Sequence, residues 1–364
     1  QVPVWDYSDA ILGAFGDEEG GAAFSNLAGL NLAEGRNLGL NGAGFRIQVV
    51  DEDSKINLNL AARADTFSQQ RMAEQILALI GGIQYNPFFE ELDADGNVQD
   101  RQTICGALID LVDPNADLNS CSPRMEQAMQ SGAEDSFYQL LKVPYRRKNA
   151  AFDSVDELRL VRGIGDDFWN TFIQPDPDDP DSRVATVWGA GPVNVNSANP
   201  QTMLTVACQK AVPDTPLCID PVVQMQFLSA LKLVSMFTPG IPLFSSPKVF
   251  IQALQGKGQI GMMMTAMQVP PVKFLSESEV EKTIAVKSSV FSVYTTGYVR
   301  QGTRETRSRI HAVIDLRGAP PPGATEMKQQ AAVIGAVTGA DVSAITNLTT
   351  LPRPGGNILY YRVD

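Results

Sequence analysis

The sequence predicts an α+β fold, in which strands near both ends of the chain form an antiparallel sheet and a large helical region is inserted between them. Apolar and polar residues alternate over residues 45–49, and the alternation returns over 286–300 and 304–316, as in half-buried strands. The sequence Gln-Gly-Thr at 301–303 lies between the two later strands and is a hairpin signal. Between these ends, over about residues 65–285, apolar residues mostly recur at helical spacing.

The predicted domain boundaries follow this change of pattern. Residues 1–64 and 286–364 are expected to form a sheet domain in two segments, and residues 65–285 an inserted, mainly helical domain. Such an insertion needs only that its two ends lie close together. A last strand is predicted over residues 358–363. Within the insertion, helices are predicted over residues 63–80, 103–112, 200–208, 221–236 and 247–254.

Residues 144–172 predict two short helices joined by a tight turn. Ser154 and Glu157 have the spacing of a capping box at the start of the first helix. The sequence Gly-Ile-Gly at 163–165 ends that helix, because glycine adopts the left-handed conformation without a steric penalty. The two aspartates at 166–167 suit the positive end of the second helix dipole. The segment therefore has the pattern of a helix-hairpin-helix motif.

The charge balance of the chain argues against a nucleic-acid partner. The 364 residues include 41 acidic and 29 basic ones, which gives a net charge of −12. A phosphate backbone would meet repulsion over most of such a surface. The sequence has no signal peptide, no initiator methionine and no apolar run that approaches the roughly 18 residues of a membrane helix. We therefore expect a processed or truncated soluble part of a protein.

Four cysteines form two close pairs along the sequence, Cys105 with Cys121 and Cys208 with Cys218. Pairing within each would close two small loops and stabilise the fold by roughly 2–3 kcal/mol each. The alternative is a zinc site, but zinc thiolates are usually about two to four residues apart and the chain has no CxxC sequence. Two disulfides are the favoured interpretation, and they indicate an oxidising compartment.

Signals for an enzyme are weak. The single histidine, His311, lies within a predicted strand. A place on one face of the sheet is a simpler explanation for it than membership of a catalytic triad. The sequence GKGQIG at 256–261 matches the letters of a dinucleotide-binding motif, but it follows a helical pattern and not a strand, so we expect a loop. A secreted hydrolase has no motif in its favour.

Acidic residues crowd one short segment after the helix predicted over 103–112. Carboxylate and amide oxygens are the hard ligands that calcium collects six to eight at a time. The alternative interpretation of the same residues is helix capping and a solvated loop. The candidate calcium ligands are Asp110, Asp113, Asn115, Asp117 and Glu134.

Four sequences, in this order and spacing, resemble the type II secretion minor pseudopilin family called general secretion pathway protein K. They are FRIQVVDEDSKINLNL at 45–60, ALIDLVDPNADLNS at 107–120 with GAEDSFY at 132–138, PYRRKNAAFDSVDELRLVRGIG at 144–165, and GPVNVNSANPQTML at 191–204. The resemblance is good over residues 45–210 and loose over 211–285, whereas 317–364 look like additional sequence. Leu111 and Val112 stand where the family often has an aromatic residue, which leaves the acidic pattern intact.

The resemblance implies a pilin-like sheet with an inserted helical domain that contains helix-hairpin-helix or SAM-like pieces, and it implies no catalysed reaction. It implies assembly with the minor pseudopilins I and J at the tip of the periplasmic pseudopilus, where the subunit initiates or caps the pilus and supports protein export. It also implies an inner-membrane anchor through an N-terminal helix that this sequence does not contain. The family's calcium binding favours calcium for the acidic segment.

Two other functions are alternatives. Helix-hairpin-helix motifs elsewhere bind DNA backbones through the amides of their glycine turn. Here Asp166 and Asp167 follow that turn and would oppose a phosphate, and the basic residues at 146–148 precede the first helix. The second alternative is a minor pilin of a related type IV pilus.

Overall fold

The computed structural model describes residues 43–63, 65–90, 100–115, 118–119, 121, 136–236, 242–319 and 356–364, and the backbone alone at 129–130 and 237. The chain divides into two compact units. The helical unit is Val50–Ser288, and the described part of the sheet unit comprises residues 43–49, 289–319 and 356–364. The sequence had placed the boundaries after residues 64 and 285, whereas residues 50–64 lie in the helical unit.

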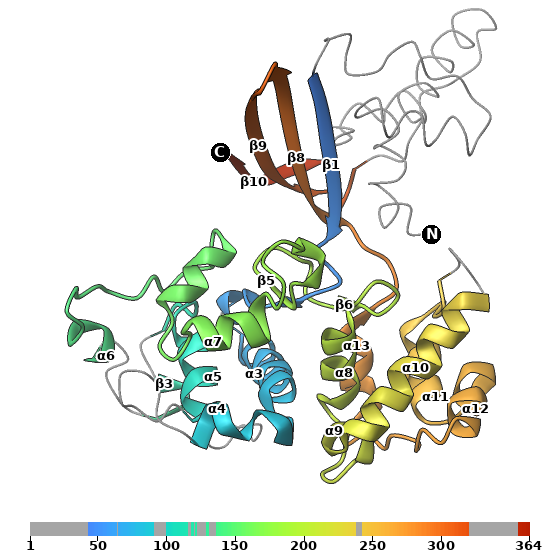
Figure 1. The fold of residues 1–364 in the computed structure, drawn as a ribbon. Coiled ribbons are helices and arrows are strands. Elements are labelled where there is room, and N and C mark those ends of the chain that lie inside the picture. The colour runs from blue at the N-terminus through green and yellow to red at the C-terminus, as the bar shows by residue number, and fades with distance from the viewer. Residues whose placement is uncertain are drawn as a thin grey trace, which may run out of the picture. The chain divides into compact units, whose positions relative to one another are not determined.

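The sheet unit contains four hydrogen-bonded strands in the order β1–β8–β9–β10 (Figure 1). Both β8–β9 and β9–β10 are antiparallel pairs. The β8–β9 hairpin keeps one register from Val290 opposite Asp315 to Gln301 opposite Arg304, and its turn contains Gly302 at a φ of 62°. The predicted hairpin and last strand are therefore confirmed. The strands are β1 (Ala43–Asp51), β8 (Val290–Gln301), β9 (Arg304–Asp315) and β10 (Asn357–Val363).

The first part of the helical unit is built on helix α3 (Thr66–Ile80). The Asp65 carboxylate caps this helix by accepting the N–H of Ser68 at 2.8 Å, and Gly81 follows its last residue. Met72, Ile76 and Ile80 are at most 1% exposed, so the apolar face of α3 forms part of the core. The neighbouring helices are α4 (Asn86–Glu90), α5 (Arg101–Asp110), α6 (Ser136–Gln139) and α7 (Asp166–Phe168).

The second part of the helical unit packs around a core that includes the fully buried Phe227, Phe244 and Phe250. Asn199 and Ser246 cap two of its helices through their side chains. The sequence at 256–261, expected to be a loop, instead begins a helix at Gly258. The helices are α8 (Pro200–Cys208), α9 (Pro216–Ile219), α10 (Pro221–Phe237), α11 (Pro247–Leu254), α12 (Gly258–Ala266) and α13 (Glu277–Lys282).

Three pairs of two-residue strands complete the helical unit, and the sequence did not predict them. Two pairs are parallel and join segments that are distant in sequence. The third pair is antiparallel and follows α5. The pairs are β2 (Ile56–Asn57) with β5 (Ala185–Thr186), β6 (Val193–Asn194) with β7 (Ile284–Ala285), and β3 (Leu118–Asn119) with β4 (Met129–Gln130).

The segment predicted as two short helices forms two helical turns of unusual pitch. The first is a 3₁₀ helix (Val155–Leu160), and α7 continues into a π-helical turn (Trp169–Ile173). Gly163, between them, has a φ of 83°, as the predicted glycine turn requires. Among the helices that the structure describes, none has the length and apolar character needed to cross a lipid bilayer.

Candidate functional site

The acidic segment begins at the C-terminal end of helix α5. Helix α5 is capped at its start by Asp100, whose carboxylate accepts the N–H of Thr103 at 2.8 Å. At its other end Asp110 and Asp113 lie three residues apart, about one helical turn. Their exposed fractions are 5% and 1%. Two acidic groups are therefore buried together at one end of a short helix.

The Asp110 carboxyl group lies in a mixed electrostatic environment. Its pKa is raised from the usual 3.8 to about 7, chiefly by burial and in smaller part by the nearby Asp113 carboxylate. The Asn119 N–H, which donates to Asp110 Oδ1 at 2.8 Å, and the Arg147 guanidinium oppose that rise in pKa. Arg147 also donates to the Asp110 carbonyl oxygen at 2.6 Å. The guanidinium therefore balances part of the buried negative charge.

Asp113 is held by two amide side chains. Its Oδ2 accepts hydrogen bonds from Gln69 Nε2 at 3.1 Å and Asn115 Nδ2 at 2.7 Å. The structure thus brings together Asp110, Asp113 and Asn115, three of the five residues predicted as calcium ligands. The other two, Asp117 and Glu134, lie outside the described residues. Over the ranges that the structure describes, no group of three or more His, Cys, Asp or Glu side chains is arranged to hold a metal ion.

A disulfide ties the acidic segment to helix α5. Cys105, in the middle of α5, is bonded to Cys121, with a Cα–Cα distance of 5.7 Å. Next to it, a Cβ atom at Gly106 would collide with the Asn119 carbonyl oxygen, so glycine allows the returning chain to approach the helix. The second predicted disulfide, Cys208–Cys218, is also formed and joins α8 to α9.

The sequence analysis did not find a cluster of buried charges that follows strand β1. Glu52 is fully buried and forms an ion pair with Arg183, which is 4% exposed. Thr186 Oγ1 donates a hydrogen bond to the same Glu52 carboxylate. Lys55, 2% exposed, donates from Nζ to the carbonyl oxygen of Asp181 at 3.2 Å, and burial lowers its pKa. The run DEDSK at 51–55 was the only sequence signal, and its partners are more than 120 positions away.

Asp51 is the centre of a second buried polar network. Its Oδ2 accepts hydrogen bonds from the hydroxyl groups of Ser197 and Ser288, and Asn194 Nδ2 lies 3.5 Å away. Its Oδ1 accepts the N–H of Asp53 at 2.9 Å. Burial raises the pKa of Asp51 to about 6, although the hydroxyl groups of both serines act in the opposite direction.

The glycine turn of the helix-hairpin-helix pattern is followed by exposed acidic residues. Asp166 and Asp167 are both exposed at the start of α7. Arg159 pairs with Asp166 at 2.6 Å, and its guanidinium lies 4.0 Å from the centre of the Trp169 ring. This cation is therefore already engaged within the protein, next to carboxylates that would repel a phosphate.

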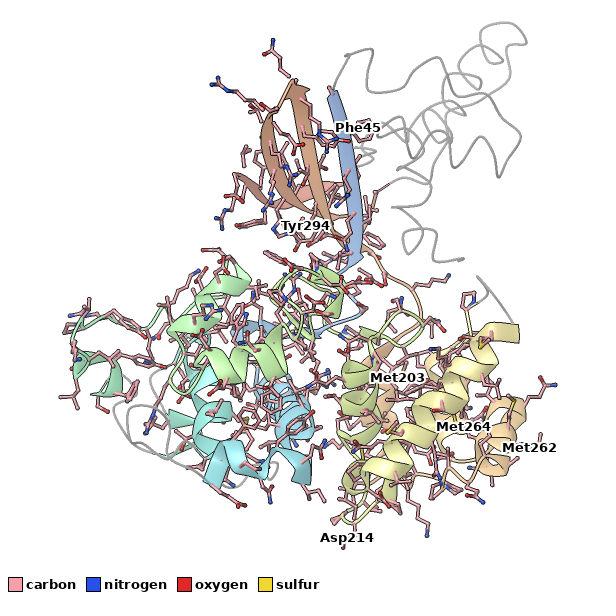
Figure 2. The ribbon with its side chains drawn as sticks, viewed as in Figure 1. Phe45, Met203, Asp214, Met262, Met264 and Tyr294 are labelled. Carbon is pink, nitrogen blue, oxygen red and sulfur yellow. A yellow bond between two sulfur atoms is a disulfide. The ribbon has the colours of Figure 1, made fainter. Side chains whose placement is uncertain are left out.

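His311 lies in the sheet unit, as predicted. Its ring stacks on Tyr294, with 4.1 Å between the ring centres. Tyr294 belongs to strand β8 and is labelled in Figure 2. The His311 Nε2 atom is 3.1 Å from Ser292 Oγ, and Ser292 is fully buried between the strands. The two side chains therefore contact each other from the neighbouring strands β9 and β8.

Four strands interrupted, between β1 and β8, by a large helical unit define the class of fold: an α+β protein with a large helical insertion in its sheet. Residues 54–172 match the family model for type II secretion system (T2SS) protein K. These residues, all within the helical unit, therefore form a protein K domain, and the resemblance inferred from the sequence is confirmed over this segment.

One solved structure gives a fold comparison for nearly the whole chain. It is a chain from the crystal structure of the GspK–GspI–GspJ complex of the enterotoxigenic Escherichia coli Type 2 Secretion System. The TM-score is 0.50 at 12% sequence identity, and the alignment covers 89% of this chain and 81% of that chain. At this identity the comparison shows a shared fold. No curated protein matches the sequence.

Proposed function

We propose that this chain is a non-enzymatic minor pseudopilin at the tip of a type II secretion pseudopilus, where it assembles with the minor pseudopilins I and J and supports protein export. The observation that carries this proposal is the protein K domain at residues 54–172. A fold shared over 89% of the chain with a member of a GspK–GspI–GspJ complex extends the argument to both units.

The size of the insertion supports a position at the tip. The helical unit Val50–Ser288 separates β1 from β8, and it is much larger than the described part of the sheet unit. Subunits along a pilus shaft must pack against neighbours on every side, and a unit of this size would obstruct that packing. At the tip only one side of the subunit meets the pilus, so the sheet unit is left to recruit the two partners.

The proposed location is the periplasm, with the inner-membrane anchor that is general in the family. Its support is the pair of disulfides, Cys105–Cys121 and Cys208–Cys218, because such bonds persist in oxidising compartments. Ser292 is buried and its neighbour His311 is half-buried in the sheet, which supports a role without catalysis.

Calcium at the end of helix α5 is a further part of the proposal. The donor set suits a hard cation, since Asp110 and Asp113 are buried carboxylates close enough to raise the pKa of Asp110. Asp110, Asp113 and Asn115, with Asp117 and Glu134 from the neighbouring sequence, would supply oxygen ligands. A bound cation would stabilise the ionised form of these carboxylates.

Affinity capture tests the proposed function. The chain, tagged at its C-terminus, is mixed with the separately purified soluble domains of pseudopilins I and J from the same system. Retention of both domains supports the proposal, and retention of neither at concentrations well above those of the periplasm would contradict it. An unrelated protein that carries the same tag serves as the control bait.

A further inference from the structure

Helix α10 has a second apolar face that the described part of the helical unit leaves exposed. One face belongs to the core of the helical unit and is at most 9% exposed, at Val223, Phe227, Ala230 and Leu231. On another face, large apolar side chains are exposed at Val222 (64%), Met225 (70%), Leu233 (37%) and Met236 (69%). The exposed side therefore indicates a contact with another molecule.

The exposed apolar residues are arranged symmetrically about Ser229, which is itself exposed. Met225 and Leu233 lie four residues before and after Ser229, and Val222 and Met236 lie seven residues before and after it. Offsets of four and seven residues return to the same side of an α-helix. The apolar side chains therefore lie at equal distances on both sides of Ser229, which is a small residue at the centre of the face.

We propose that this face, formed by Val222, Met225, Ser229, Leu233 and Met236, is the contact between two copies of the chain, in which two α10 helices cross antiparallel at Ser229. A two-fold axis at Ser229 places Met225 against Leu233 of the partner subunit, and Val222 against Met236 of the partner subunit. Ser229 is small, so the two helices can approach closely at the crossing. This inference is independent of the proposed function.

Charge favours a second copy at this helix over other parts of the helical unit. Residues 50–288 include 30 acidic and 19 basic residues, so two copies repel each other over most of their surfaces. Helix α10 has no acidic residue, and its one charged side chain is Lys232. In the antiparallel crossing Lys232 lies across from Gln226 of the partner subunit, because these residues are three positions either side of Ser229. The two lysines therefore do not oppose each other.

The size of the face predicts a weak dimer. Helix α10 has 17 residues, and a helix of that length extends about 25 Å. One side of it, about 10 Å wide, contributes roughly 250 Å² per copy, and the total of roughly 500 Å² is about a third of the roughly 1,600 Å² that a stable complex usually buries. We therefore expect the dimer to form at high micromolar concentration and to dissociate on dilution.

The crossing point is tested by cross-linking Ser229→Cys. The four native cysteines are all in disulfides, so the new thiol would be the free one. Two thiols at the two-fold axis face each other, and mild oxidation should yield a disulfide-linked dimer. The matched control is Ser235→Cys, which is exposed on the same helix but outside the face. We expect it to cross-link about tenfold more slowly, because its thiols are not held together; equal rates would overturn the proposal.

Sedimentation of the intact chain tests the apolar contacts. The wild-type chain should dimerise as concentration rises, and Met225→Glu should remain monomeric. The control is Leu140→Glu, which changes an 86% exposed side chain elsewhere in the helical unit and should dimerise as the wild type does. Thermal unfolding should be unchanged in both variants. A wild-type chain that is monomeric at all concentrations, or a Met225→Glu dimer of wild-type affinity, would overturn the proposal and leave the face to another occupant.

Discussion

The Asp51 carboxylate accepts a hydrogen bond from the Ser288 hydroxyl group, although the two residues are 237 positions apart in sequence. Asp51 is the last residue of β1, and Ser288 lies two residues before β8. The bond therefore joins the points at which the chain enters and leaves the helical unit. Ser197 adds a donor from a third segment, so one carboxylate connects three parts of the unit.

Removing this carboxylate should change how stability depends on pH. Burial raises the pKa of Asp51 to about 6 in the folded chain, above its usual 3.8. The folded state therefore holds the proton more tightly, and this group's contribution to the free energy of unfolding falls as pH rises from about 4 to about 7, by about 3 kcal/mol in total. The Asn side chain of Asp51→Asn does not ionise, so the variant's unfolding free energy should lack this contribution to its pH dependence.

Urea unfolding of wild type and Asp51→Asn across that pH range measures the effect. We expect the difference, wild type minus variant, to be largest near pH 4 and to decrease with rising pH. Ser288→Ala, which removes one donor and keeps the carboxylate, is the control and should retain the dependence. Parallel pH profiles of the unfolding free energy for wild type and Asp51→Asn would contradict a raised pKa for Asp51.

Removing one partner of the Glu52–Arg183 pair should strongly lower the free energy of unfolding. Arg183→Met leaves the fully buried Glu52 carboxylate without its guanidinium, and such a change typically costs about 3–5 kcal/mol. The double variant Glu52→Gln with Arg183→Met should recover part of that loss in denaturant unfolding. Lys282→Gln, at the exposed pair with Glu279, is the control and should cost less than about 1 kcal/mol. A similar small loss for Arg183→Met would show that the pair is unimportant.

The Cys208–Cys218 disulfide should contribute measurably to the stability of the helical unit. It closes a loop of 10 residues between α8 and α9, and a loop of that length predicts about 3 kcal/mol from the reduced entropy of the unfolded chain. Replacing both cysteines by alanine should lower the unfolding free energy by about that amount. If the double variant and wild type unfold at the same denaturant concentration, the loop is not the source of stability.

Calcium should raise the melting temperature if the acidic end of α5 binds it, because a ligand specific to the folded state stabilises that state. Asp113→Asn should abolish the rise, since Asp113 is a buried carboxylate of the predicted site. Asp167→Asn, an exposed acidic residue at the start of α7, is the control and should retain it. Titration calorimetry with calcium distinguishes specific binding from a general effect of charge. An equal rise in both variants would contradict the proposed ligands.

Local signals in the sequence predicted the elements that depend on neighbouring residues. Helix α11 is an example: the sequence predicts a helix over residues 247–254, and the structure has one from Pro247 to Leu254. The β8–β9 hairpin was likewise marked by its glycine turn, and the cysteine spacing indicated both disulfides. In each case the determining contacts lie within a few to sixteen positions.

Features that depend on distant partners could not be predicted. The donors to Asp51 come from Ser197 and Ser288, which no local pattern connects to it. The same holds for the parallel pairing of Ile56–Asn57 with Ala185–Thr186, where two residues are too few to show a strand period. The 3₁₀ and π pitch around residues 155–173 was also missed, since helix-capping signals do not specify pitch.

The most direct test of the proposed tip role is size-exclusion chromatography with light scattering on a mixture of this chain with the soluble domains of pseudopilins I and J, run with calcium and with a chelator. We predict one peak with the summed mass of the three proteins in the presence of calcium. Loss of that peak on chelation would give the acidic end of α5 a role in assembly. Three separate species at all concentrations, with calcium present, would contradict the tip assignment.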